Sequence, residues 1–557
     1  MSTMTIQRLP RFFAVALALA LSIGLVVASL LLMPAAAHAD TAPLDPTNPA
    51  SPPTVSADAL PTTQIDGVAW AQVVVGDTVY VAGKFSTARP AGAAPGVNTV
   101  VRNNILAYNI KTGALITTFH PSLNAQALGI TASPDGSRVY VVGDFTSVDG
   151  AGYYRAAAFS TATGAIIPAF RPILESQGRA VVATNTAVYL GGTLSSVNGQ
   201  ARGYVAKINA SNGSVASWNP NADSTVTALA LTPDGSKVIL GGRFSHVGGA
   251  SNYGLAAADT TTGTVLPWAA NQTVRDAGVN SSITALYATN DRIYGSGYVF
   301  GTLADGNLEG IFSADPNTGN INWVEDCHGD SYSVYAVGDV VYGAGHPHYC
   351  GNIGGFPQTT PLTYHHTLAF SKAATGTITK DPLGYFNWAG KPSPSLLNWF
   401  PQYVTGSYTG QGQAAWSLSG NSNYVVVGGE FPYVNGVAQY GLTRFAVSSI
   451  APNKIGPNIN TALVPTVTSS TTGEVRVSWT STYDQDNKHL TYSLVRDKSS
   501  NVGPIYTTTQ EATFWQRVNM GFIDKGLTPG STHTYRIFVT DPFGNSVSRL
   551  SASVTVL

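Results

Sequence analysis

The densest group of potentially reactive side chains lies between positions 327 and 350. It holds the only two cysteines of the chain, Cys327 and Cys350, together with His328, His346 and His348. Cysteine and histidine at such spacings could bind a metal ion such as zinc. In an exported chain, however, two cysteines favour a disulfide, because oxidising compartments support that bond. We therefore expect a Cys327–Cys350 disulfide and no cofactor, with the three histidines as candidate ligand-binding residues.

An aromatic-rich insertion further along the chain is a second candidate site. Flat aromatic rings beside polar groups can hold sugars. Trp399 precedes Phe400 and Pro401, and so fits a recurrent aromatic-x-Pro position that belongs to the core. Tyr385 and Trp388 fit no such position. These two residues are therefore the aromatic ligand-binding candidates.

A third group of polar residues lies near the C-terminus and consists of Asp484, Asp486 and Asn487. Oxygen-bearing side chains of this kind can bind Ca²⁺, but the run lacks the glycine and the distal glutamate of an EF-hand loop. A polar loop between two strands is the simpler interpretation. The sequence therefore predicts no metal site, and these three residues remain weak candidates for one.

No catalytic motif stands out in the sequence, which contains no nucleophile elbow, phosphate-binding loop or HExxH helix. A glycosidase needs two carboxylates at a set separation. The acidic residues are scattered over different parts of the chain, as Glu175, Glu309, Glu325 and Glu430 illustrate. We assign no catalytic residue, although two distant carboxylates could still meet in the fold.

Seven copies of one apolar strand must position these candidate residues. They read VYVAGKF (79–85), VYVVGDF (139–145), VYLGGTL (188–194), VILGGRF (238–244), IYGSGYV (293–299), VYGAGHP (341–347) and VVVGGEF (425–431). A period of roughly 40–50 residues built from short strands is typical of propeller blades. Turns such as Pro134–Ser137 predict further strands on either side, and hence four antiparallel strands in each repeat.

One position of this strand is polar or aromatic in every copy, although its neighbours are apolar residues or glycine. The residues there are Lys84, Asp144, Thr193, Arg243, Tyr298, His346 and Glu430. They could simply be solvated strand ends. Alternatively, they form a polar ring around the mouth of a propeller, in which Glu430, Lys84 and Asp144 would stand in the order acid, base, acid.

The repeat resembles a known family. GG-x-F followed by VNG and an aromatic-x-Pro segment, such as Trp218–Pro220, resembles the delta-sixty-type propeller repeats of secreted bacterial proteins. The resemblance covers about residues 62–455, although Val299 and Pro347 replace the phenylalanine in the fifth and sixth copies. It implies a seven-bladed β-propeller and a surface or extracellular role, and it transfers no catalytic residue.

The two ends of the predicted propeller should meet in its seventh blade. That blade lacks its fourth strand, and open edges must be covered. We expect Thr62–Asp66 to supply the strand beside Tyr440–Val447.

Residues 456–557 follow a different pattern. VRVSW at 475–479 alternates, and Leu527–Tyr535 resembles the tyrosine-corner stretch of fibronectin type III domains. We therefore expect an all-β chain, in which a fibronectin type III-like β-sandwich follows the propeller.

The N-terminal region predicts export. Residues 1–39 combine early arginines, an apolar run over Phe12–Met33 and a small-residue cleavage site at Ala37–Ala39, as in a signal peptide. The run is also long enough for an uncleaved anchor. Residues 40–61 are rich in Pro, Ala, Ser and Thr and are expected to be a disordered spacer. The sequence thus predicts a secreted or cell-surface protein with no membrane span after cleavage.

Function can be narrowed only to a class. A net charge of −1 argues against a nucleic-acid partner. We expect a binding protein whose partner is an extracellular polysaccharide or protein. The alternatives are a glycoside hydrolase or accessory protein of polysaccharide degradation, with its site in the propeller mouth, and a structural envelope protein. Two acidic groups converging in one concave pocket would favour the enzyme over a binding module.

Overall fold

The computed structural model describes residues 40–497 and 503–557. Strands dominate this part of the chain, and its one α-helix, α2 (Ala270–Thr273), is a single turn, so the predicted all-β class is confirmed. Within the described residues, none of the helices has the length and apolar character needed to cross a membrane. The expected signal peptide, residues 1–39, lies outside the described residues.

Seven sheets of three or four antiparallel strands occupy the described chain between residues 68 and 446. Their first three strands are β2 (Val68–Val75), β3 (Thr78–Lys84) and β6 (Ile105–Asn109); β7 (Ala127–Ala132), β8 (Arg138–Gly143) and β11 (Ala156–Ser160); β12 (Gly178–Ala183), β13 (Ala187–Gly192) and β16 (Val205–Asn209); β17 (Val226–Leu231), β18 (Lys237–Gly242) and β21 (Leu255–Asp259); β23 (Ser281–Ala288), β24 (Ile293–Val299) and β25 (Gly310–Ala314); β27 (Ser331–Val337), β28 (Val340–Gly345) and β29 (Thr367–Ser371); β32 (Ala415–Gly420), β33 (Tyr424–Gly429) and β36 (Leu442–Ala446). In every sheet the repeated sequence forms the middle of the three strands, as predicted from the hairpin order.

A fourth strand is regular in two sheets and reduced in others. β22 (Val265–Leu266) and β26 (Ile321–Glu325) complete the fourth and fifth sheets. Elsewhere single bridges such as Tyr108–Leu115 and Phe370–Leu396 mark the same position. The V-[ND]-G motif after the repeated strand forms a tight turn with positive φ at both central residues, for example 50° at Asn435 and 75° at Gly436. This turn joins β34 (Tyr433–Val434) to β35 (Val437–Ala438), as a two-residue hairpin loop requires.

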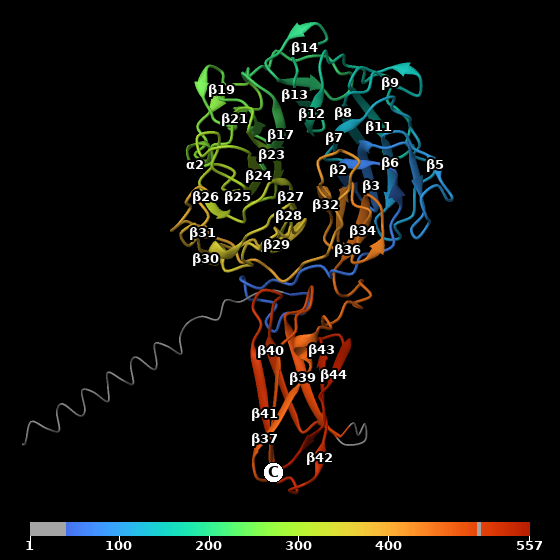
Figure 1. Ribbon diagram of the computed structural model, residues 1–557. Coiled ribbons are helices and arrows are strands. Elements are labelled where there is room, and N and C mark those ends of the chain that lie inside the picture. Colours follow the sequence, from blue (N-terminus) through green and yellow to red (C-terminus); the bar gives the residue numbers. More distant parts are fainter. Residues whose placement is uncertain (1–39, 498–502) are drawn as a thin grey trace, which may run out of the picture. The chain divides into compact units, whose positions relative to one another are not determined.

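The sheets follow one another in a closed order. The first strand of each sheet contacts that of the next, from β2 through β7, β12, β17, β23 and β27 to β32, and β32 contacts β2. Figure 1 shows these strands around the inside of a ring of sheets. The paired glycines of the repeat permit this packing. A Cβ on Gly241 would lie 2.7 Å from Ile283 of the next sheet, and one on Gly242 would lie 2.2 Å from the carbonyl oxygen of Thr225.

The N-terminal segment covers the edge of the seventh sheet, but with residues slightly upstream of those predicted. Leu60 pairs with Arg444, and the Ser56 amide donates to the Ala446 carbonyl. The predicted segment, Thr62–Asp66, instead contains β1 (Gln64–Ile65), which pairs with β4 (Thr87–Arg89) of a small sheet completed by β5 (Val100–Val101). Within the predicted segment the Ile65 amide does donate to the Tyr440 carbonyl at 3.2 Å, so the prediction holds at that end, whereas the pairing along the third strand is made by the upstream residues Leu60 and Ser56.

Residues 40–61 are not a disordered spacer, which corrects the sequence interpretation. Val55 is 4% exposed and Ala57 is fully buried in the core of the sixth and seventh sheets. Thr54 and Ser56 are also buried. The Pro, Ala, Ser and Thr composition suggested flexibility, but small side chains also allow an extended segment to pack closely between other elements.

The remaining strands form two facing sheets in residues 466–555. One contains β37 (Thr466–Thr471), β38 (Glu474–Thr480) and β41 (Asn519–Lys525), and the other contains β40 (Tyr506–Glu511), β39 (His489–Arg496), β43 (Tyr535–Thr540) and β44 (Ser546–Leu550). A small pair, β42 (Thr532–His533) and β45 (Val554–Thr555), adjoins them. Alternate residues of facing strands, including Trp479, Tyr492 and Tyr535, share one core. This packing explains why buried and more exposed residues alternate along these strands.

Candidate ligand-binding cleft

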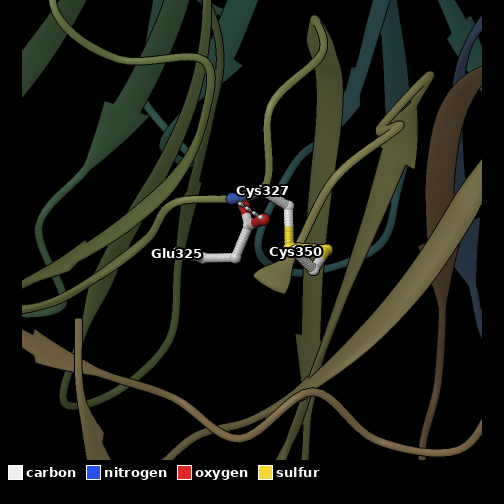
Figure 2. Close-up of side chains that lie close together, drawn as sticks. All are labelled: Glu325, Cys327 and Cys350. Atoms are coloured by element: carbon white, nitrogen blue, oxygen red, sulfur yellow. Dashed lines mark hydrogen bonds between the residues drawn. A yellow bond between two sulfur atoms is a disulfide. The ribbon is translucent and has the colours of Figure 1, made fainter. Parts of the chain in front are cut away.

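Cys327 and Cys350 form the predicted disulfide, with their Cα atoms 4.2 Å apart. Cys327 precedes β27 and Cys350 follows β28, so the bond joins the start of one strand to the end of its hairpin partner. Glu325 is buried beside them and accepts a hydrogen bond from the Cys327 amide (Figure 2). It also accepts one from the Ile311 amide. The three residues Glu325, Cys327 and Cys350 are grouped closely enough to hold an ion, but both sulfur atoms are already bonded. A metal bound through these thiols is therefore excluded.

A cavity of about 640 Å³ opens next to this disulfide. Four chain segments line it: residues 299–303 at and after the end of β24; Gly306, Asn307 and Glu309 before β25; Asp326 and His328 after β26; and residues 383–386 of the aromatic-rich insertion. The fifth sheet, the link to the sixth sheet and the insertion thus contribute to one concave surface. Its volume is in the range of small-ligand sites.

Two carboxyl groups in this cavity are held in an environment that disfavours their charge. Burial, with a contribution from Asp330, raises the pKa of Glu309 to about 7. Burial, Asp381 and Glu309 together raise the pKa of Asp326 to about 8. Each therefore keeps its proton at a pH where an exposed carboxyl would be ionised. A protonated carboxyl both donates and accepts hydrogen bonds, which suits hydroxyl groups of a ligand.

His328 forms one side of the cavity and is almost completely buried. Its Nε2 lies 2.9 Å from Asp381 Oδ2 and 3.8 Å from Asp326 Oδ1. The first contact has the distance of an ion pair without the alignment of a hydrogen bond, so among the described residues both ring nitrogens lack a hydrogen-bond partner. Burial lowers the pKa of His328 to about 4, against the opposing effect of Asp381. The imidazole is therefore neutral at physiological pH.

Tyr385 is placed against His328 by a turn that Asp381 stabilises. Asp381 Oδ1 accepts the backbone N–H groups of Leu383, Gly384 and Tyr385 at 2.7–3.1 Å. The Tyr385 ring then lies over the His328 ring, with centroids 3.9 Å apart. Two predicted ligand-binding residues, 57 positions apart in the sequence, thus form one aromatic surface.

Trp388 does not offer a free ring face, in contrast to the expectation from the sequence. It is 3% exposed, and its indole N–H donates to the Asn307 carbonyl at 2.9 Å. Its ring also packs edge-on against Phe386. Trp388 therefore holds the insertion against the segment before β25, and Phe386 lines the cavity instead.

The other two histidines of the sequence cluster lie beside the cavity rather than in its lining. His348 Nε2 is 3.5 Å from the Tyr385 hydroxyl. His346 Nδ1 is 3.0 Å from the Tyr332 hydroxyl and 3.1 Å from Gln413 Oε1. The cluster therefore divides into His328 in the lining, His348 behind Tyr385, and His346 in a separate polar network.

The variable polar positions make contacts between neighbouring sheets, and Glu430, Lys84 and Asp144 stand on successive sheets of the closed order as predicted, but the charge pairing expected from that order does not form. Arg243 donates to the Tyr298 hydroxyl at 2.6 Å, and Asp144 accepts from Gln177 of the next sheet at 2.8 Å. Lys84 lies over the Tyr408 ring and, among the described residues, forms no ion pair with either predicted acid. The carboxylates of Asp144 and Glu430 instead accept hydrogen bonds from uncharged donors.

Glu430 and Thr193, at two further variable positions, also form hydrogen bonds with uncharged groups. Glu430 accepts from the Thr409 amide and hydroxyl and from the Trp416 indole. The Thr193 hydroxyl donates to the Gln177 carbonyl at 3.5 Å. A role of these positions in ligand binding stays a prediction.

Sequence reasoning missed the carboxyl groups of the cleft. Asp326 stands directly before Cys327, and Asp381 opens the run Asp-Pro-Leu-Gly, which is typical of a tight turn. Both sequence features concern only neighbouring residues, and neither indicates that Asp326 or Asp381 lies near Glu309 in the fold. The weak metal candidates Asp484, Asp486 and Asn487 lie elsewhere, in the buried connection between β38 and β39.

Comparison with known proteins does not extend these observations. No model of a known protein family matches the chain, and a search of curated proteins found no match. Function must therefore be argued from the cleft itself.

Proposed function

We propose that the chain is an exported seven-bladed β-propeller of the delta-sixty type followed by a fibronectin type III-like module. The closed order of seven similar sheets supports the propeller, and so does the repeated motif on the second strand of each. The division of seven strands into sheets of three and four, with Trp479 and Tyr535 in the shared core, supports the module. Export and a cell-surface or extracellular location rest on the character of residues 1–39.

In this proposal the propeller binds an extracellular polysaccharide in the cleft. The observation that carries it is one cavity lined both by Tyr385, whose ring stacks on the buried His328, and by two carboxyl groups with raised pKa values. Aromatic faces pack against the apolar faces of sugar rings, and protonated carboxyl groups exchange hydrogen bonds with hydroxyl groups. A cavity of about 640 Å³ accommodates a short stretch of a glycan better than a protein surface.

The charged residues that line the cleft limit the kinds of glycan that it can bind. Of the described residues that line the cavity, none is lysine or arginine, whereas Glu309 and Asp326 are acidic. An anionic glycan would face buried carboxyl groups without a compensating cation. The cleft therefore suits a neutral glycan or one that carries amino groups.

Glycoside hydrolysis in the same cleft is a second candidate function. It is favoured by one observation: Glu309 and Asp326 line the same cavity, and their pKa values are raised to about 7 and about 8. Near neutral pH such a pair changes protonation stepwise, so one group can donate a proton while the other accepts one. A shared cavity meets one requirement of hydrolysis, but a glycosidase also needs its two carboxyl groups at a set separation, so binding is the first proposal and hydrolysis the second.

Affinity electrophoresis of the purified protein against neutral, amino-bearing and acidic polysaccharides tests binding. We expect retardation by a neutral or amino-bearing glycan, lost in Tyr385→Ala and kept in the control Tyr433→Ala, which alters an exposed tyrosine in the β34–β35 hairpin. Retardation only by acidic glycans, or equal retardation of both variants, would contradict the proposal. Release of reducing ends that disappears in Glu309→Gln, while binding remains, would establish hydrolysis.

A further inference from the structure

The connection between β38 and β39 carries its charged residues in an unusual environment. Asp484 and Asp486 are each 2% exposed, and Asn487 and Lys488 are each 1% exposed. Charged side chains are almost never fully buried unless they are paired or bind a metal. The contacts of these side chains therefore show whether their charges are compensated.

The two carboxyl groups of the turn contact each other. Asp484 Oδ1 accepts the Asp486 amide at 3.1 Å, and the two side chains also lie within hydrogen-bonding contact. Burial and their mutual repulsion raise the pKa of Asp484 and, through burial above all, that of Asp486. The more distant Asp541 and Asp58 add negative charge on the same side.

The nearby basic side chains are engaged elsewhere. Lys488 Nζ pairs with Glu511 Oε2 at 2.7 Å. His489 bridges Asp40 and Glu511, at 3.2 Å and 2.6 Å. Among the described residues, no lysine, arginine or histidine forms an ion pair with Asp484 or Asp486. Ionisation of either carboxyl group would therefore leave a negative charge that no basic side chain of the described residues compensates.

Side-chain oxygen atoms in the turn also lack donors. Asp484 Oδ2 and Asn487 Oδ1 are buried without a hydrogen-bond partner in the described structure. The three side chains form one connected group, because Asp484 contacts the Asp486 carboxyl group and Asn487 Nδ2 donates to Asp486 Oδ1 at 2.8 Å. An unpartnered buried oxygen costs roughly 1–3 kcal/mol, so these two oxygens beside an acidic pair call for a hydrogen-bond donor or a cation.

We propose that Asp484, Asp486 and Asn487 bind a calcium ion. All three offer oxygen, the ligand atom that Ca²⁺ prefers, and two carboxylates supply the charge for a divalent cation. The backbone carbonyls of Asp484, Gln485 and Asp486 already accept from Asn398, Phe400 and Thr41. The remaining ligands would be water and the side-chain oxygen of Gln485, which is also buried without a hydrogen-bond partner in the described structure. Loose, water-completed geometry suits Ca²⁺ better than Mg²⁺, which demands a near-ideal octahedron.

The ion would stabilise the N-terminal segment that closes the ring of sheets. Asp486 Oδ2 accepts the Ala57 amide at 2.6 Å and the Ser56 hydroxyl at 3.0 Å. Ser56 belongs to the segment that covers the edge of the seventh sheet, where its amide donates to Ala446. A calcium ion that keeps Asp486 ionised thus strengthens hydrogen bonds that hold this segment. The site lies apart from the cleft and is independent of the ligand proposed there.

Calcium titration of the purified, EDTA-treated protein tests the site. We expect one equivalent of Ca²⁺ to bind in calorimetry and to raise Tm, by about 3 °C at a hundredfold excess over Kd if the chain unfolds as one unit. Mg²⁺ should give a much smaller shift. Asp484→Asn and Asn487→Ala should remove most of the binding, whereas Asp497→Asn should not, because Asp497 is an exposed carboxylate of the same module that contacts His533.

Two outcomes would overturn the proposal, and the first needs only the wild-type protein. The first is no calcium binding to the wild-type protein. The second is a wild-type Tm that is indifferent to Ca²⁺ and rises as the pH falls from 8 to 5, with this rise lost in Asp484→Asn. That result would identify a proton shared by Asp484 and Asp486 as the positive group.

Discussion

The guanidinium group of Arg444 donates a hydrogen bond to the carbonyl oxygen of Pro61 at 2.6 Å, across 383 residues of sequence. Its Nε also donates to the Thr62 hydroxyl, and its remaining terminal nitrogen donates to the carbonyls of Ile110 and Lys111. Arg444 is 2% exposed. One buried cation therefore connects the seventh sheet, the N-terminal segment and the turn that follows β6.

Replacing Arg444 with alanine should lower the free energy of unfolding by roughly 3 kcal/mol or more, because hydrogen bonds to charged groups contribute about 1.5–3 kcal/mol each. Arg444→Lys should recover little, since an ammonium group cannot reach several carbonyls in a planar array. Urea unfolding measures both. The control is Lys111→Ala, which removes an exposed ion pair with Asp77 and should cost about 1 kcal/mol or less. Equal effects of Arg444→Ala and Lys111→Ala would contradict the anchoring role.

Deleting residues 54–62 should lower the melting temperature sharply. The deletion removes the Leu60–Arg444 pairing and the buried Val55 and Ala57 from the core, and it leaves the edge of the seventh sheet open. Differential scanning calorimetry measures the shift. An unchanged melting temperature would show that the seventh sheet does not depend on the N-terminal segment.

The repeats could be predicted from the sequence because each rests on local and periodic signals. The glycine pair, the apolar strand before it and the V-[ND]-G turn each have one physical cause that recurs in most sheets, such as the contact of Gly241 with Ile283. The register of the closing segment could not be predicted in the same way. It depends on hydrogen bonds between Leu60 and Arg444, which are far apart in the sequence.

Only some residues of the cleft could be predicted from the sequence, because the others are brought together by contacts between distant segments. Tyr385 and His328 were identified by residue type, and the disulfide by cysteine count and hairpin order. Glu309, Asp326 and Asp381 come from three segments with no common period, so only the fold brings them near each other. Burial, which raises the pKa of Glu309 and Asp326, has no signature in a single sequence.

Removing the disulfide should destabilise the sixth sheet and weaken ligand binding together. The bond closes a loop with a sequence separation of 23, for which chain-entropy arguments give roughly 3 kcal/mol. It also holds His328, which follows Cys327 directly and lines the cavity. We expect Cys327→Ser/Cys350→Ser to lower Tm and to bind glycan less well, as measured by calorimetry and affinity electrophoresis. A reductant should lower the Tm of the wild-type protein and leave that of the double variant unchanged.

Glu309 and Asp326 should each contribute a loss of stability as the pH rises from about 4.5 to 8, whereas His328, whose pKa burial lowers to about 4, contributes in the opposite direction over the lower part of this range. The pKa values of both carboxyl groups are raised in the folded state, to about 7 and about 8, so folding favours the protonated forms. Below the unfolded-state pKa values, near 4, both states bind the proton and folding incurs no cost. As the pH rises further, the unfolded chain releases its protons first, and the folded state loses stability until its own pKa values are passed.

Variants isolate this contribution from that of other titrating groups. His489, whose pKa Asp40 and Glu511 raise to about 9 despite burial, changes stability in the same direction at higher pH. We therefore compare variant with wild type at each pH. Glu309→Gln should recover on the order of 3 kcal/mol at pH 8 relative to pH 4.5, and Asp326→Asn should also flatten the profile. Asp339→Asn, in the exposed turn between β27 and β28, is the control and should leave the slope unchanged. Urea unfolding from pH 4.5 to 8 measures these slopes, and parallel profiles for all four proteins would show that the carboxyl groups of the cleft are ionised in the folded state.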